Sequence, residues 1–191
     1  MSIAKSLVLI TVLGGVAAAD DGTISGSVEA KPSKFLKDTI VFIKQVPNAH
    51  TTPSTFEIDQ KTLTFEPHIV IAAVGDTVKF HNHDKVDHNV TSPEGKYDLG
   101  TWGVGASKEQ VFKTAGVFSQ VCKLHPEMLA YVFVGQNRFA AVVSENGKFM
   151  INNVPAGSYE LDVWNPKLKA APQKVTVAAN AAATVHFSLA R

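Results

Sequence analysis

The sequence predicts an all-β protein built from two β-sandwiches. Short segments with alternating apolar and polar residues recur along the chain, rich in β-branched and aromatic residues and bounded by Gly, Pro, Asn and Asp. No segment shows a sustained helical period of apolar residues, so a sandwich is the expected architecture. The segments expected to be strands are 23–29, 39–44, 68–72, 77–80, 109–113, 116–122, 129–134, 158–164 and 174–177.

Residues 1–19 are typical of a secretory signal peptide. Lys5 precedes an apolar run from Leu7 to Val16 that is too short to span a bilayer, and small residues precede a cleavage site after Ala19. A mature chain of 172 residues (191 minus 19) would follow. We expect an exported, periplasmic protein without a membrane span, because no later segment has 18 unbroken apolar residues.

The charge balance and the single cysteine exclude some classes of function and favour others. The chain has 18 basic and 17 acidic residues, and removal of Lys5 with the signal peptide leaves 17 of each (18 minus 1). This balance argues against a nucleic-acid partner, which favours a surface of one sign. The single cysteine, Cys122, cannot form an internal disulfide, and a bound metal ion would occupy it in an oxidising compartment.

The stretch from Val117 to Met128 has the side chains of a metal site. Cys122, His125 and Met128 follow one another at three-residue intervals. A thiolate, an imidazole and a thioether suit copper better than magnesium, calcium or structural zinc. A site with two histidines, one cysteine and a weak axial methionine needs one more histidine. His88, in Asp-His-Asn-Val, is the candidate.

These residues resemble the cupredoxins, the type 1 blue copper proteins. Cys-x-x-His-x-x-Met is similar to the short ligand loops of amicyanins and pseudoazurins, and His88-Asn89 is similar to the family's upstream histidine motif. The resemblance implies a Greek-key β-sandwich that binds one type 1 copper ion. It makes His88, Cys122 and His125 the equatorial ligands. Met128 would be the axial ligand, and Asn89 would hydrogen-bond the ligand loop without touching the metal.

The flanking residues carry a second resemblance. Residues 144–161, with an Asn-Gly turn, an aromatic strand and Val-Pro-Ala-Gly-Ser-Tyr, resemble carboxypeptidase regulatory-like domains, which are small transthyretin-like β-sandwiches. Residues 24–28 and 40–43 resemble the first strands of that family, but they precede the copper motif. The order of the two parts is similar to that of exported plastocyanin-like proteins sometimes labelled methylamine-utilisation proteins.

This order predicts an inserted domain. The cupredoxin, residues 53–137, is expected to interrupt a discontinuous sandwich formed by residues 22–48 and 138–191. The alternative is a tandem arrangement in which residues 22–48 supply the first strands of the cupredoxin itself.

The leading functional interpretation is a periplasmic one-electron carrier that uses Cu(II) and Cu(I) and exchanges electrons with an unidentified redox protein. Four protein ligands leave no open position for a substrate, so we do not expect an enzyme. Two alternatives stay open: a copper chaperone or storage protein with the same ligands, and a partner-binding sandwich with a secondary copper site. His81 and His83, two residues apart, form either a second metal-binding pair or a polar strand face.

Overall fold

The computed structural model describes residues 20–49 and 51–191, so the expected signal peptide lies outside the described residues. Within these ranges the chain forms sixteen strands and one short 3-10 helix, η1 (Ser33–Phe35). The expected all-β fold class is confirmed. Within the same ranges, no helix has the length and apolar character needed to traverse a bilayer.

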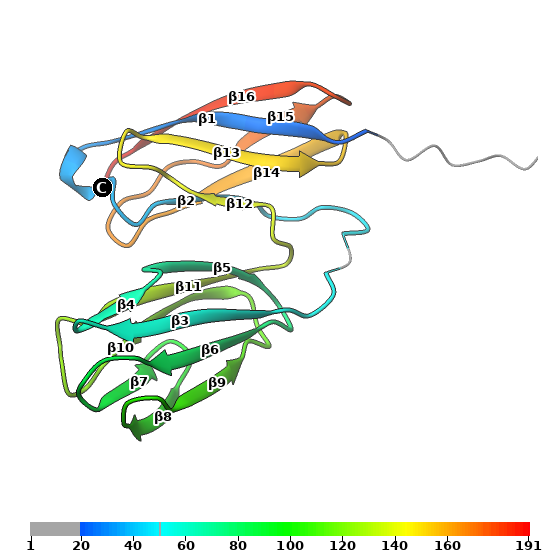
Figure 1. Cartoon of the computed structure of the whole chain (residues 1–191). Coiled ribbons are helices and arrows are strands. Elements are labelled where there is room, and N and C mark those ends of the chain that lie inside the picture. The colour runs from blue at the N-terminus through cyan, green and yellow to red at the C-terminus, as the bar shows by residue number, and fades with distance from the viewer. Residues whose placement is uncertain (1–19, 50) are drawn as a thin grey trace, which may run out of the picture.

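Nine strands from the middle of the chain form one sandwich, which we call the central sandwich (Figure 1). Its two sheets have the strand orders β5-β11-β10-β7-β8 and β4-β3-β6-β9. Buried side chains that include Ile58, Phe80 and Val132 form its core. The strands are β3 (Thr55–Lys61), β4 (Thr64–Glu66), β5 (Ile69–Ala73), β6 (Thr77–Asn82), β7 (His88–Ser92), β8 (Tyr97–Trp102), β9 (Ser107–Val111), β10 (Gly116–Val121) and β11 (Leu129–Gly135).

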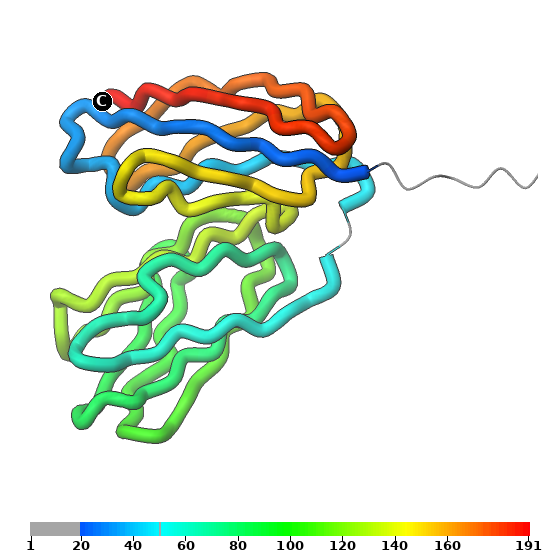
Figure 2. Tube along the Cα trace, turned by 45° about the horizontal axis from the view of Figure 1, so that its top comes forward, coloured from blue at the N-terminus to red at the C-terminus, as the bar shows by residue number. Residues whose placement is uncertain are grey.

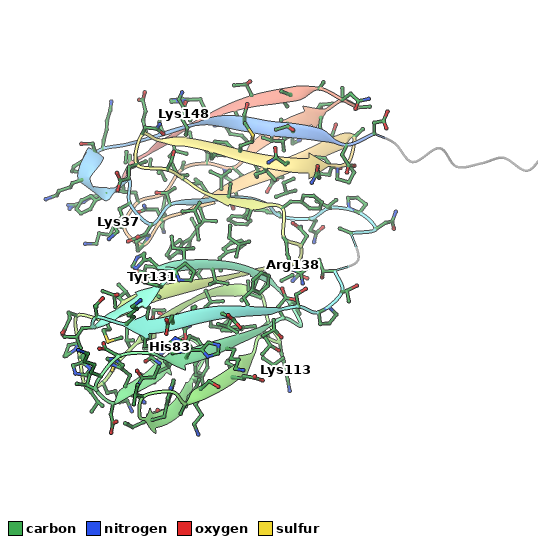
Figure 3. The ribbon with its side chains drawn as sticks, in the orientation of Figure 1. Lys37, His83, Lys113, Tyr131, Arg138 and Lys148 are labelled. Carbon is green, nitrogen blue, oxygen red and sulfur yellow. The ribbon has the colours of Figure 1, made fainter. Side chains whose placement is uncertain are left out.

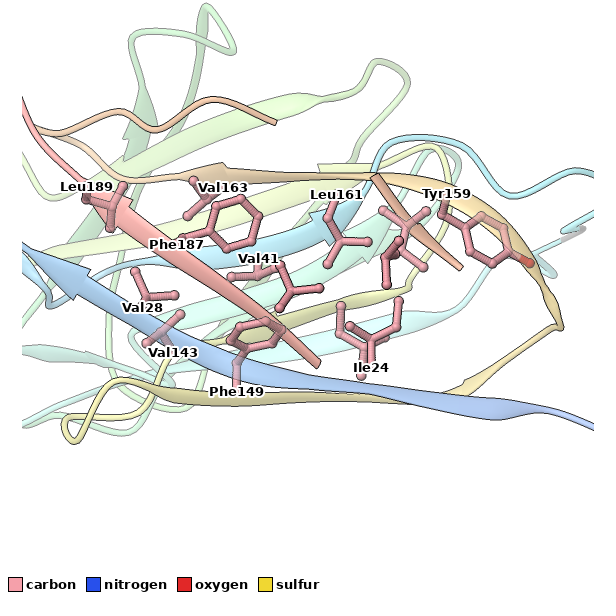
Figure 4. Close-up of a cluster of buried hydrophobic side chains, with 14 of the residues drawn as sticks. Ile24, Val28, Val41, Val143, Phe149, Tyr159, Leu161, Val163, Phe187 and Leu189 are labelled. Atoms are coloured by element: carbon pink, nitrogen blue, oxygen red, sulfur yellow. The ribbon is translucent and has the colours of Figure 1, made fainter. Parts of the chain in front are cut away.

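Strands from the two ends of the described chain form a second sandwich, the terminal sandwich (Figure 2). Its sheets have the orders β13-β1-β16 and β12-β2-β14-β15. Figure 4 shows Ile24, Phe149 and Phe187 among the side chains buried between these sheets. The strands are β1 (Gly22–Ala30), β2 (Ile40–Ile43), β12 (Ala140–Val142), β13 (Lys148–Val154), β14 (Gly157–Trp164), β15 (Gln173–Val177) and β16 (Ala182–Leu189).

The first strand, β1, joins the two ends of the chain in one sheet. It runs antiparallel to β13 and parallel to β16, with Gly26 opposite Phe149 on one side and Val185 on the other. Gly26 is required here because a Cβ atom would lie 2.0 Å from the carbonyl oxygen of Val185 and 2.7 Å from the Phe149 ring. Residues from before and after the central sandwich therefore share one core.

Arg138 holds both segments that connect the two sandwiches. Its Nε donates to Asp76 Oδ2 (2.9 Å), and its Nη2 donates to Asp76 Oδ1 and to the carbonyl oxygen of Thr52 (2.8 Å). The Asp76 side chain is 1% exposed and also accepts the backbone N–H groups of Ser54 (2.8 Å) and Ala73 (2.7 Å). Figure 3 shows Arg138 at the junction between the sandwiches.

Aromatic side chains form contacts between the two sandwiches. The rings of Phe42 and Phe133 lie 4.8 Å apart, and those of Tyr131 and Trp164 lie 5.1 Å apart. In each pair one ring comes from β11 and the other from the β12-β2-β14-β15 sheet. The face of the central sandwich that contains Tyr131 is thus covered by the terminal sandwich (Figure 3).

The predicted metal ligands lie at the end of the central sandwich away from the segments that connect it to the terminal sandwich. Strand β10 begins with Gly116 opposite Val134, close to where the chain leaves the sandwich. It ends with Val121 opposite Leu129, and Cys122 follows. Antiparallel pairing of β7 with β10 brings the start of β7 to the same end. The fold therefore places the predicted ligands away from the two connecting segments (Figure 1).

Candidate metal centre

The structure brings His88, Cys122 and His125 together. His88 is the first residue of β7, while Cys122 and His125 lie in the loop between β10 and β11. The Nδ1 atoms of the two histidines are 3.2 Å apart. The Cys122 Sγ atom is 4.0 Å from Nδ1 of His88 and 3.7 Å from Nδ1 of His125. Among the described residues, this is the group of three such donors that lie within 4.8 Å of one another.

The dimensions of this triangle fit a transition-metal ion. The triangle has sides of 3.2, 3.7 and 4.0 Å. A point in its plane about 2.0 Å from each nitrogen lies about 2.3 Å from the sulfur, and these are the usual bond lengths of a first-row ion such as zinc to imidazole and thiolate. The distances accept several metals, and zinc also binds imidazole and thiolate. Two imidazoles and one thiolate in a trigonal arrangement are the donors of a blue-copper site.

The centre is shielded from water. His88 is completely buried, Cys122 is 2% exposed and Met128 is 1% exposed, whereas His125 is partly exposed. The backbone N–H of Met128 donates to the carbonyl oxygen of His125 (3.0 Å), which closes the turn after the second histidine. The Met128 side chain is buried in the same apolar cluster as Cys122. Its role as the axial ligand stays a prediction.

Asn89 links the upstream strand to the ligand loop. Its backbone N–H donates to Cys122 Sγ (3.4 Å), and its side-chain oxygen accepts the N–H of Lys123 (3.3 Å). The side-chain amide nitrogen donates to Asp98 Oδ1 (2.7 Å) and to the carbonyl oxygen of Gly100 (3.0 Å). These bonds fix the position of the thiol and of the residue that follows it.

Two carboxylates near the centre were not anticipated from the sequence. Asp84 Oδ2 lies 3.1 Å from Nε2 of His88, and hydrogen bonds from the backbone N–H groups of Leu63 and Lys85 hold the pKa of Asp84 at about 2. Asp84 precedes His88 by four residues, but this spacing in a loop predicts no contact. Only the turn that follows β6 brings the carboxylate to the imidazole.

Asp98, on β8, is the second of these carboxylates. Its Oδ2 accepts the ammonium group of Lys123 (2.6 Å), and its Oδ1 accepts the backbone N–H of Gly100 (2.8 Å) as well as the amide of Asn89. Lys123 is the main cause that lowers the pKa of Asp98 to about 2. Asp98 therefore anchors Asn89 and the ligand loop at the same time.

His81 and His83 lie apart from this centre, on the outer face of the β4-β3-β6-β9 sheet. Their rings stack with centroids 5.6 Å apart and planes 7° from parallel. His81 Nε2 is 3.5 Å from Glu57 Oε1, and His83 Nδ1 is 2.9 Å from Asp59 Oδ2. Each imidazole thus faces a carboxylate of the neighbouring strand β3, and Figure 3 shows His83 on this face.

Apolar side chains are exposed around the centre. Leu124 in the ligand loop is 50% exposed, Val104 after β8 is 68% exposed and Val86, two residues before His88, is 44% exposed. Trp102, by contrast, is only 6% exposed and belongs to the core of the central sandwich. It lies opposite His88 across the β7–β8 pair.

Solved structures similar to this one include cupredoxins. A purple cupredoxin from Nitrosopumilus maritimus has 26% identity and a TM-score of 0.39, over 42% of this chain and 99% of that protein. The Cu(I) form of an amicyanin variant has 22% identity and a TM-score of 0.41, over 49% of this chain and 97% of that one. A copper-containing nitrite reductase from Thermus scotoductus SA-01 has 20% identity and a TM-score of 0.40, over 48% of this chain but 25% of the reductase.

A different family model matches the C-terminal part of the sequence. It describes the beta-sandwich domain of ER membrane protein complex subunit 7, and it aligns with residues 121–188, from the end of β10 to the penultimate residue of β16. The match covers 68 of 191 residues (188 minus 120) and is not to the carboxypeptidase regulatory-like family expected from the sequence. No curated protein sequence matches the chain.

Proposed function

We propose that this protein is an exported type 1 copper protein that carries single electrons between redox proteins. The observation that carries the proposal is the closed triangle of two imidazole nitrogens and one sulfur at the end of the central sandwich. His88, Cys122 and His125 would hold the ion in a plane, with Met128 as a weak axial ligand. When bound, copper supplies the exchange of one electron between Cu(II) and Cu(I).

The surrounding residues support such a role because they hold the donors still. Cys122 directly follows a strand that is paired along its whole length with β11, and its sulfur accepts the N–H of Asn89. His88 is fixed between Asp84 and the other two donors. Donors that keep their positions when the ion changes charge favour rapid electron transfer, since little rearrangement accompanies the change.

Burial favours a carrier over the alternative of a copper chaperone. A chaperone must release its ion to another protein, which requires donors that an incoming ligand can reach. Here His88 is completely buried and Cys122 is 2% exposed, whereas His125 is partly exposed at the surface. Electrons can pass through the edge of His125, whereas the ion itself is enclosed. We also propose that the protein is not an enzyme, because four protein ligands would leave no position on the copper ion for a substrate.

Copper titration of the purified protein tests this proposal. We expect one equivalent of Cu(II) to produce the intense blue absorption of a thiolate-to-copper transition, and Cys122→Ser to abolish this absorption while the circular dichroism of the β-sandwiches is retained. Serine stays protonated and cannot replace the charge-donating sulfur. A wild-type protein that binds only Cu(I) without colour would favour the chaperone, and a blue band retained by the Ser variant would refute the ligand assignment.

A further inference from the structure

The far side of the His88 ring contacts a carboxylate. Nε2 of His88 is 3.1 Å from Oδ2 of Asp84, while Nδ1 faces His125 and Cys122. The His88 side chain is completely buried, and the Asp84 side chain is 14% exposed. Both nitrogens of a buried ring therefore have defined neighbours, and these neighbours indicate which nitrogen carries the proton.

The neighbours of the ring select one tautomer. An ionised carboxylate can only accept hydrogen bonds, so the contact with Asp84 requires the His88 proton to be on Nε2. The lone pair of Nδ1 then points toward Cys122 and His125. In the metal-free protein, the 3.2 Å contact between the two Nδ1 atoms requires His125 to supply the proton, because His88 Nδ1 is the acceptor. The ring is thus oriented for a metal before any metal is bound.

The carboxylate is itself held in place. Asp84 Oδ2 accepts the N–H of Leu63 and Oδ1 accepts the N–H of Lys85, both at 2.8 Å. The N–H of Asp84 donates to Oδ1 of Asn82 (3.0 Å), a fully buried side chain whose Nδ2 donates to the carbonyl oxygen of Val86 (2.9 Å). Two hydrogen bonds to the carboxylate and one from the Asp84 backbone therefore keep Oδ2 next to the ring.

We propose that Asp84 is a positioning residue that fixes the Nε2–H tautomer of His88 and strengthens Nδ1 as a donor. A carboxylate that accepts the remote N–H of a ligating imidazole increases the basicity of the ring, and losing such a partner typically lowers metal affinity about 10- to 100-fold. The more highly charged Cu(II) gains more from a basic ligand than Cu(I). For the copper centre, which rests on the proposed function, Asp84 therefore lowers the reduction potential; the tautomer itself does not depend on copper.

The first test uses the metal-free wild-type protein. Nitrogen-15 NMR distinguishes the two neutral tautomers of each histidine by the chemical shifts of their ring nitrogens. We expect His88 to be protonated on Nε2 and not on Nδ1, with the opposite assignment for His125. A His88 ring protonated on Nδ1 would overturn the proposal without any variant being made.

The second test compares two variants with the same change of charge. Asp84→Asn keeps the shape of the side chain but removes its charge, and Asp87→Asn removes one charge at an exposed site directly before His88. Zn²⁺ titration is expected to show an affinity about 10-fold lower for Asp84→Asn than for Asp87→Asn. If copper binds as proposed, a 10-fold loss of Cu(II) affinity relative to Cu(I) raises the reduction potential of Asp84→Asn by about 59 mV.

The outcomes separate this inference from the proposed function. Equal Zn²⁺ affinities and equal potentials in the two variants, with the blue colour retained, would refute the role of Asp84 and leave the electron carrier intact. A protein without a blue copper complex would refute the carrier, while the tautomer and the Zn²⁺ affinities would still test Asp84. Circular dichroism shows whether each variant is folded, and the NMR test on the wild type decides the tautomer if Asp84→Asn is not.

Discussion

Replacing Arg138 with glutamine should destabilise the protein through the buried Asp76. The substitution removes both side-chain hydrogen bonds to the carboxylate and the bond to the Thr52 carbonyl oxygen. Breaking a buried ion pair by removing one partner costs about 3–5 kcal/mol. The Arg138 side chain is 30% exposed, and Asp76 keeps the N–H groups of Ser54 and Ala73. We therefore expect a loss near the lower limit, about 3 kcal/mol at neutral pH.

The loss should depend on pH in a defined direction. Burial alone would raise the pKa of Asp76, but hydrogen bonds from Arg138, Ala73 and Ser54 outweigh burial and hold the pKa below its usual 3.8. A group with a lowered pKa in the folded state stabilises the fold above its unfolded pKa, and this contribution disappears as the pH falls through the folded pKa. The difference in stability between wild type and Arg138→Gln should therefore shrink as the pH falls below about 4.

Urea denaturation at pH 7 and pH 3 measures this difference. Tryptophan fluorescence reports on both sandwiches, because Trp102 lies in the core of the central sandwich and Trp164 on β14 of the terminal one. Lys113→Gln, which removes a positive charge from an exposed position, is the matched control. A loss below about 1 kcal/mol at pH 7, or an equal loss at both pH values, would show that the pair does not act as described.

Three further predictions concern the metal centre. Met128→Leu should keep the blue spectrum and raise the reduction potential, by about 59 mV for each tenfold weakening of Cu(II) binding relative to Cu(I). A variant unable to bind copper would show that Met128 is needed for binding and does not only adjust the reduction potential. Asn89→Ala should lower the free energy of unfolding by about 1–3 kcal/mol, because Asp98, the Gly100 carbonyl oxygen and the Lys123 N–H each lose a hydrogen bond to the amide. An unchanged urea midpoint would contradict this. The fragment 53–137 should fold and bind copper, as all proposed ligands lie within it, whereas aggregation would favour the tandem arrangement.

Much of the fold could be predicted because local patterns determine it. All nine segments expected to be strands overlap strands of the structure. Strand β3 (Thr55–Lys61) is one of several strands outside these segments; its half-buried Phe56 and buried Ile58 are followed by a buried glutamine, Gln60, which weakens the apolar alternation. The parallel pairing of β1 with β16 joins residues about 160 positions apart, and no local pattern specifies such a partner.

In the candidate site, too, local sequence spacing predicts some features, while others depend on the tertiary fold. Cys122 and His125 are close in sequence, and their spacing alone indicates a shared ligand loop. The contacts of Asp84 with His88 and of Asp98 with Lys123 depend on how the loop after β6 and strand β8 are placed beside the ligand residues, and no local sequence pattern specifies this placement. The pair formed by Arg138 and Asp76 has the same origin, because it joins the segment after β11 to the turn between β5 and β6, 62 positions away in the chain.

A redox titration of the copper-loaded protein tests the central claim most directly. The absorbance of the thiolate-to-copper band is followed while the potential is lowered and then raised again. The account predicts that the band bleaches and returns fully, following a one-electron curve of about 59 mV per tenfold change in the ratio of oxidised to reduced protein. Loss of copper on reduction, or a bound copper without the band, would contradict an electron carrier with Cys122 as its ligand.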